Sequence, residues 1–121
     1  MKDVKLTESE EMFAELIWEK EPIASGALVK LCLEKLNWKK STTYTMLKKL
    51  CEKGLFKNEQ AVVTSRLTKD EYYSKQSILF VEDTFGGSLP EFLTAFMGSK
   101  KLNKQQAEEL KRLIDEHKEE K

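Results

Sequence analysis

The sequence of 121 residues lacks several features on which enzymes and membrane proteins depend. It has a single histidine, His117, so a zinc site with the usual nitrogen and sulfur ligands cannot be built from one chain without carboxylates. No glycine-rich phosphate loop follows a strand pattern, and no nucleophile–histidine–acid set can form beyond this lone histidine. No segment approaches the roughly 18–20 apolar residues of a membrane span. We therefore expect no enzyme, no cofactor and no metal centre.

Cysteine is also scarce, which bears on the compartment. Cys32 and Cys51 are the only two, and each lies within an apolar helical pattern. We interpret them as packed thiols of a reduced protein, with a disulfide or a metal role as the alternative. The N-terminal residues MKDVKLTESEE lack the apolar run of a signal peptide. These observations predict a cytoplasmic protein.

The chain has no net charge, because 21 basic residues balance 21 acidic ones. This balance argues against a polycation that coats nucleic acid. The charges are unevenly distributed, however: residues 38–69 carry 8 basic and 2 acidic side chains, whereas residues 70–99 carry 1 basic and 5 acidic. Such asymmetry indicates an anion-binding face in the middle of the chain.

Start and stop signals divide the chain into six expected helices. Three pairs have the spacing of a capping box and begin the first, fourth and sixth helices: Thr7 with Glu10, Thr68 with Glu71, and Asn103 with Gln106. The second helix follows Pro22, has Ser25 as its candidate cap and ends at Asn37. The third begins at Ser41 and runs to Gly54, which suits the left-handed position that closes a helix.

Residues 55–67, LFKNEQAVVTSRL, have β-forming residues at both ends of a polar centre, so we expect a short two-stranded hairpin. The fourth helix should extend to about Thr84, before GGSLPE, and a short fifth helix should end at Gly98. Three helices followed by a hairpin is the order of a winged helix-turn-helix domain. The expected fold class is mainly α: this domain over residues 1–69, then a helical dimerisation region over residues 70–121.

The third helix is expected to have two chemically different faces. At about 100° per residue, an arc of about 120° holds short hydroxyl-bearing and basic side chains: Ser41, Thr42, Thr45, Lys48 and Lys49. The opposite, core-facing arc holds Thr43, Met46, Leu47, Leu50 and Cys51, with Tyr44 on the flank. Hydroxyls and methyls can approach base edges closely, and lysines reach phosphates or guanine edges. A merely solvated basic face is the alternative, but such faces usually mix Glu with Lys and seldom accumulate Thr.

The hairpin adds two cationic residues to the expected DNA contacts. We place Lys57 at its tip and Arg66 on its return strand, where a winged helix meets the phosphate backbone or the minor groove. A turn that is polar only for solubility is the alternative, because Glu59 is also expected at the tip.

The helices after residue 69 carry more apolar side chains than so small a segment can bury alone. Those of the fourth and fifth helices are Tyr72, Tyr73, Ile78, Leu79, Phe80, Phe85, Leu89, Phe92, Leu93 and Phe96; the sixth adds a narrow seam of Leu110, Leu113 and Ile114. We predict that they form a subunit interface, which would couple two weak DNA half-sites. Packing back onto the winged helix in a monomer is the alternative.

These residues also carry a resemblance to a known family. The opening LTESE and the pair Ile17-Trp18 match its first helix, and its recognition helix, W-S-P-K-T-V-x-T-L-L-x-R-L-x-x-K-G, is matched at Trp38, Thr42, Thr45, Leu47, Leu50, Lys53 and Gly54. The segment LNKQQAEELKRLIDEHK is similar to its last dimerisation helix. Over nearly its whole length the chain resembles the penicillinase-repressor (BlaI/MecI/CopY type) family of bacterial transcriptional repressors.

The resemblance implies a homodimer that binds a dyad-symmetric double-stranded DNA operator and represses downstream genes. It implies base or backbone contacts by Ser41, Thr42, Tyr44, Thr45 and Lys49. Where the family has Ser-Pro, this sequence has Lys39-Lys40, which adds charge where phosphates would lie. Lys49 replaces a usual Arg and loses its bidentate fork, so operator preference should differ.

The sequence departs from the family pattern at the sites of regulation. Members that are relieved by a sensor protease are cut before a Phe, at a place that aligns with Ala95-Phe96, where Asn is typical at the first position. The paired Cys-x-Cys motifs of the copper-responsive branch do not occur in this sequence. Two other functions stay open: a winged-helix adaptor whose basic arc binds an acidic protein, and a regulator that senses a small molecule between dimer helices.

Overall fold

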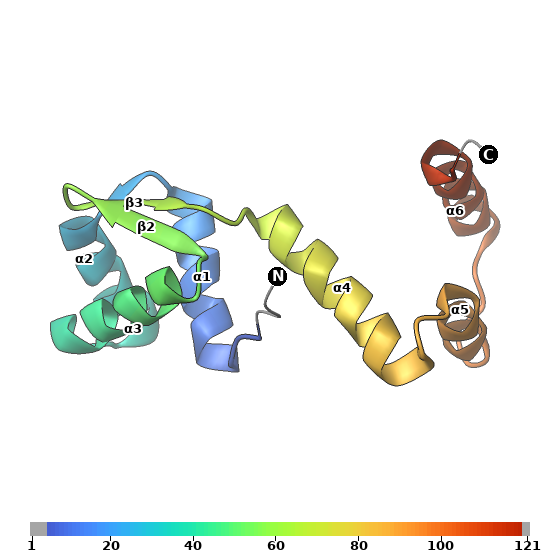
Figure 1. Cartoon of the computed structure of the whole chain (residues 1–121), viewed down its shortest axis with the longest axis horizontal. Coiled ribbons are helices and arrows are strands. Elements are labelled where there is room, and N and C mark those ends of the chain that lie inside the picture. Colours follow the sequence, from blue (N-terminus) through green and yellow to red (C-terminus); the bar gives the residue numbers. More distant parts are fainter. Residues whose placement is uncertain (1–4, 120–121) are drawn as a thin grey trace. The chain divides into compact units, whose positions relative to one another are not determined.

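The structure is a computed structural model that describes residues 5–119. In this range the chain forms nine elements (Figure 1): helices α1 (Glu8–Lys20), α2 (Ser25–Leu36), α3 (Lys40–Glu52), α4 (Lys69–Phe85), α5 (Leu89–Met97) and α6 (Lys104–His117), and strands β1 (Ile23–Ala24), β2 (Phe56–Glu59) and β3 (Val62–Ser65). The chain divides into two compact units between Ile78 and Leu79. A mainly helical chain with a small antiparallel sheet confirms the predicted fold class.

Local hydrogen bonds set most of the helix ends. At the start of α1, the Glu10 N–H donates to Thr7 Oγ1 at 3.2 Å and the Thr7 N–H donates to Glu10 Oε1 at 2.8 Å. The same reciprocal bonds form at the other two predicted capping boxes, Thr68 with Glu71 and Asn103 with Gln106. Gly54 has a φ of 90° after α3, as predicted. These signals act within a few residues, which is why the sequence reveals them.

The start of α2 differs from the prediction. Ser25 is the first helical residue, and Ala24, which precedes it, has no side chain that can cap. The Ser25 N–H donates instead to the Ala61 carbonyl at 2.9 Å. The predicted Ser25 cap is therefore wrong, because the turn of the hairpin satisfies this donor. Asn37 ends the helix in the left-handed conformation, with a φ of 57°.

The sheet is antiparallel, with the strand order β1-β3-β2. Strands β2 and β3 form the predicted hairpin, with Phe56 opposite Ser65. Its two-residue turn is Gln60-Ala61, and both residues have a positive φ, as a type I′ turn requires. The sequence does not predict β1, because two residues are too few to show an alternating pattern.

The hairpin places two predicted contact residues differently from the expectation. Lys57 lies within β2, opposite Thr64, and not at the tip. Arg66 follows β3, and its N–H donates to the Leu55 carbonyl at 2.7 Å. The expected positions in the hairpin are therefore wrong for both. Both side chains are exposed, and their contact with DNA stays a prediction.

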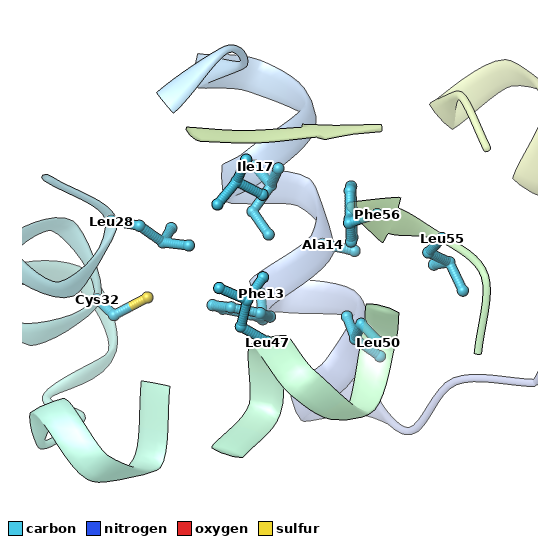
Figure 2. Close-up of a cluster of buried hydrophobic side chains, with 10 residues drawn as sticks. Phe13, Ala14, Ile17, Leu28, Cys32, Leu47, Leu50, Leu55 and Phe56 are labelled. Carbon is cyan, nitrogen blue, oxygen red and sulfur yellow. The ribbon is translucent and has the colours of Figure 1, made fainter. Parts of the chain in front are cut away.

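The core of the first unit lies between α1, α2, α3 and the sheet (Figure 2). Its buried cluster consists of Phe13, Ala14, Ile17, Leu28, Cys32, Leu47, Leu50, Leu55, Phe56 and Val63. Cys32 belongs to the cluster, Cys51 packs against it, and both thiols are free. Burial raises the pKa of both thiols. The cysteines are thus packed core residues, as interpreted from the sequence.

The first half of α4 packs on α1 through Tyr72. This residue is 1% exposed, its ring centroid lies 5.6 Å from that of Trp18, and its hydroxyl donates to Glu11 Oε2 at 2.8 Å. The next residue, Tyr73, donates to Glu15 Oε2 at 2.6 Å. The prediction that Tyr72 belongs to a subunit interface is wrong, because its own chain already buries it.

The second unit has no core of its own among residues 79–119, since none of these residues is buried. Phe80, Phe85 and Phe92 pack edge to face, with ring centroids 5.5–6.0 Å apart. An apolar groove of about 350 Å³ is lined by residues of α5 and α6 and by Leu102 between them. Large apolar side chains on these helices therefore remain accessible to another molecule.

Candidate nucleic-acid interface

Helix α3 presents one exposed and one buried face, as the periodicity predicts. The exposed residues include Ser41, Thr42, Thr45, Lys48 and Lys49, whereas Thr43, Leu47 and Leu50 are buried. The helix follows α2 after a short turn, Asn37 to Lys39, and its buried face packs into the core of the winged helix. The hydroxyl-bearing and basic side chains thus project from the molecule on a rigid support.

A shallow hollow of about 250 Å³ lies on this face, lined by Ser41, Thr42, Thr45, Met46 and Lys49. The sequence assigns Met46 to the core-facing arc, but the residue is half-buried: it packs against the core and also lines the hollow. Hydroxyls, a thioether and an ammonium therefore converge on one surface. These groups can contact base edges and thymine methyls in a major groove.

The N-terminus of α3 carries a concentration of positive charge. Lys39 is the N-cap and Lys40 the first helical residue; both are exposed, and no side chain caps this end. The first backbone N–H groups of a helix have no partner within the helix, and the helix dipole favours an anion there. The geometry suits a phosphate, which helix N-termini commonly bind.

Tyr44 lies beside this face and does not point from it. The residue is half-buried, packs against the core, and its hydroxyl lies 3.4 Å from Ser25 Oγ on α2. Lys48 is exposed but does not line the hollow. Of the predicted contacts on α3, the structure therefore gathers Ser41, Thr42, Thr45 and Lys49 most closely.

The two basic residues of the hairpin segment lie apart from this hollow. Lys57 Nζ is 3.5 Å from Glu59 Oε1 in an exposed ion pair. Arg66 lines a different hollow of about 540 Å³, together with residues of the first half of α4. Their proximity to a duplex thus depends on how the DNA lies against the domain.

Glu10 is a partner of the exposed face that the sequence did not identify. Glu10 is buried, with Oε1 3.0 Å from Lys53 Nζ and Oε2 3.2 Å from Lys49 Nζ. Burial opposes ionisation, but the Thr7 N–H and the two ammonium groups outweigh it and lower the pKa of Glu10 to about 2. The sequence did carry a signal that Glu10 faces inward: it precedes the buried Phe13 by three residues and therefore lies on the same face of the helix.

Within residues 5–119, no three histidine, cysteine or acidic side chains lie close enough together to hold a metal ion. No helix in the described part of the chain is both long and apolar enough to span a membrane.

Comparison with known proteins assigns the chain to a family. Residues 6–116 match the model of the penicillinase repressor family. The chain is 23% identical, over 118 residues, to a penicillinase repressor of Bacillus licheniformis; the alignment covers 94% of this chain and 92% of that protein. The match spans both units, and the winged helix with its exposed α3 face has the architecture of a DNA reader. The chain therefore belongs to the penicillinase repressor family, whose members are DNA-binding transcriptional repressors.

Proposed function

We propose that the protein represses transcription in the cytoplasm as a homodimer on a dyad-symmetric operator. The observation that carries the proposal is the exposed face of α3, on which Thr42, Thr45 and Lys49 line one hollow over a buried apolar base. In a helix-turn-helix domain the second helix of the motif, which is α3 in this chain, enters the major groove. The threonines then read base edges, while lysines hold the backbone.

Phosphate contacts fix the register of the helix in the groove. We assign one phosphate contact to Lys39 and Lys40, which lie at the uncapped N-terminus of α3. Residues 38–69 carry a net charge of +6, from 8 basic and 2 acidic side chains, while the chain as a whole is neutral. This segment can therefore attract DNA through its charge, although the chain as a whole is neutral.

The missing core of the second unit supports dimerisation. A single winged-helix domain with a few cationic contacts would bind DNA weakly, and its affinity would fall steeply as the salt concentration rises. In a dimer, two α3 helices that lie about one turn of the DNA apart, or a multiple of that, would couple two half-sites. We assign the interface to the predicted residues that remain accessible: Tyr73, Ile78, Leu79, Phe80, Phe85, Leu89, Phe92, Leu93, Phe96, Leu110, Leu113 and Ile114.

Relief by a sensor protease would require a change in α5. The Ala95-Phe96 bond lies inside this helix, Leu89–Met97, and both residues are exposed. A helical bond must unwind before it can enter an extended protease site. The Ala in place of the family's typical Asn adds a second difference, so our proposal rests on DNA binding and does not depend on cleavage.

Selection from a pool of random-sequence duplexes tests the proposal. The protein should enrich a dyad-symmetric sequence whose half-site centres are about 10 base pairs apart, or a multiple of that. Binding to random duplex that disappears in moderate salt, with no sequence enriched, would instead favour the adaptor function. The enriched sequence, which we call the selected duplex, is the probe for the further experiments.

A further inference from the structure

We propose that Glu10 is a positioning residue for DNA binding: from inside the first unit it holds the Lys49 ammonium at the edge of the exposed face of α3. The inference rests on the proposed function and adds to it. It identifies a residue of α1, remote from the recognition helix in sequence, on which the conformation of a DNA contact depends.

The Glu10 carboxylate lies between two lysines: Lys49, in the last turn of α3, and Lys53, the residue that caps its C-terminus. Glu10 Oε2 lies 3.2 Å from Lys49 Nζ, and Glu10 Oε1 lies 3.0 Å from Lys53 Nζ. The carboxylate cannot move to follow either lysine, because its Oε1 also accepts the Thr7 N–H at 2.8 Å and its side chain is buried. It is a fixed anion, and the lysines adapt to it.

The two lysines use this anion differently. The Lys53 side chain is 34% exposed, and its ammonium donates to both oxygens of Glu10 and to the Lys5 carbonyl at 3.3 Å. The Lys49 side chain is 55% exposed and lines the hollow with Thr42 and Thr45. An ammonium has three N–H donors, so Lys49 can bond to Glu10 and still offer donors to a base edge or a phosphate.

Holding a lysine in this way reduces the entropy that its binding costs. A free lysine side chain loses rotamer freedom when it contacts a ligand. Because Lys49 already contacts Glu10 at the surface, part of that freedom is lost before the DNA arrives. Lys49 also does not readily leave the buried carboxylate for a phosphate, since Glu10 would lose one of the two cations that hold it ionised.

A double-mutant cycle tests the coupling between Glu10 and Lys49. The variants are Glu10→Gln, Lys49→Met and the pair, measured as folded full-length proteins on the selected duplex. Glu10→Gln keeps an oxygen for the Thr7 N–H while it removes the charge. We expect it to weaken binding about 10-fold in the wild-type background and less than about twofold when Lys49 is already Met, because Glu10 then has nothing to position.

Lys53→Met is the matched control. It removes the other ammonium group that contacts the Glu10 carboxylate, and Lys53 does not line the hollow. It should leave affinity for the selected duplex within about twofold of wild type. An equal loss from Glu10→Gln in both Lys49 backgrounds would show a purely structural role and overturn the inference. Tighter binding by Glu10→Gln would also overturn it, because Glu10 would then compete with the DNA for Lys49. If the wild-type protein enriches no duplex, the proposed function itself fails.

A second measurement needs no change at Glu10, and it applies even if Glu10→Gln does not fold. Nitrogen-detected NMR of lysine ammonium groups reports hydrogen-bonded lysines through their slow proton exchange. We expect the signal that disappears in Lys49→Arg to show this slow exchange both without DNA and with the selected duplex. A Lys49 signal that exchanges as fast as the exposed Lys100 in the free protein would contradict the positioning role.

Discussion

At the scale of single residues, Thr43 is the poorly hydrogen-bonded polar group of the core. Among residues 5–119, its Oγ1 is the buried side-chain oxygen without a hydrogen bond of ordinary geometry, and its polar neighbour, the Cys32 thiol, can form only a weak one. A buried, unsatisfied hydroxyl costs about 1–3 kcal/mol. The sequence periodicity places Thr43 inside, but it cannot show whether a partner is present, since that depends on side chains of another helix.

Replacing Thr43 by Val should therefore stabilise the protein. Valine keeps the branched shape of threonine and removes the unsatisfied oxygen, so we expect the free energy of unfolding to rise by about 1 kcal/mol. Urea denaturation followed by circular dichroism measures the change. Thr42→Val, the same substitution on the exposed face, should alter stability by less than about 0.5 kcal/mol. A loss of stability in Thr43→Val would mean that the hydroxyl has a partner.

Glu10 should make the stability of the protein sensitive to acid. Its pKa is lowered from 4.5 to about 2 in the folded state, so it stabilises the fold above pH 4.5. That contribution, on the order of 3 kcal/mol, should disappear as the pH falls from 4.5 towards 2. Urea denaturation between pH 2 and pH 6 should show this decline in the wild type and a weaker one in Glu10→Gln. Parallel profiles of the two proteins would contradict the assignment.

Two residues show which contacts the sequence can and cannot predict at this scale. The sequence correctly places Glu10 in a capping box, which is local, but its ion pairs with Lys49 and Lys53 join segments about 40 residues apart. The sequence also shows that Tyr72 needs an apolar partner. It cannot show that Trp18 and Glu11 of the same chain provide the contacts.

At the scale of the elements, α3 is the helix on which the proposed DNA contact depends. Its exposed and buried residues alternate with the predicted helical period, because the apolar face of the helix has to pack on the core. The capping boxes of α1, α4 and α6 are predictable because they too are local. Strand β1 and the start of α2 are not, since both depend on pairing with the hairpin: β1 with β3, and the Ser25 N–H with the Ala61 carbonyl.

Replacing Thr45 by Glu should abolish specific DNA binding and leave the domain folded. Thr45 is exposed, so the longer acidic side chain disturbs no core contact, but it would face the phosphates and base edges of the groove. We expect affinity for the selected duplex to fall by more than about 100-fold, because like charges at an interface cost several kcal/mol. Gel-shift titration measures the loss, and thermal melting should show an unchanged domain.

Thr45→Ser is the control for this substitution, because it keeps a hydroxyl at the same position. It should bind within about 10-fold of the wild type, since it removes only the methyl group that can touch a thymine methyl. Retained specific binding by Thr45→Glu would contradict the assignment of α3 as the reading helix.

At the scale of the whole molecule, the proposed dimer rests on the second unit. None of residues 79–119 is buried, although this region contains several phenylalanines and leucines. The sequence predicts this excess from composition and from the family resemblance. It does not predict how two copies would meet in the proposed dimer, since register and symmetry are properties of an assembly and not of one helix.

Replacing Leu113 by Glu should dissociate the dimer. Leu113 is 47% exposed on α6, and two-fold symmetry would place two carboxylates at the interface in the variant. Light scattering after gel filtration at micromolar concentration should show a monomer, while the near-ultraviolet signal of the winged helix persists. Gln105→Glu adds the same side chain on α6 away from its apolar seam and should remain dimeric. A wild-type protein that is itself monomeric under these conditions would refute the interface.

Hydroxyl-radical footprinting on the selected duplex tests the central claim most directly, because it reports where each copy of α3 meets the DNA. We predict two protected patches related by the dyad, about 10 base pairs apart or a multiple of that, and both absent with Thr45→Glu. A single patch, or protection that survives in Thr45→Glu, would contradict the claim that two symmetry-related α3 helices read the operator.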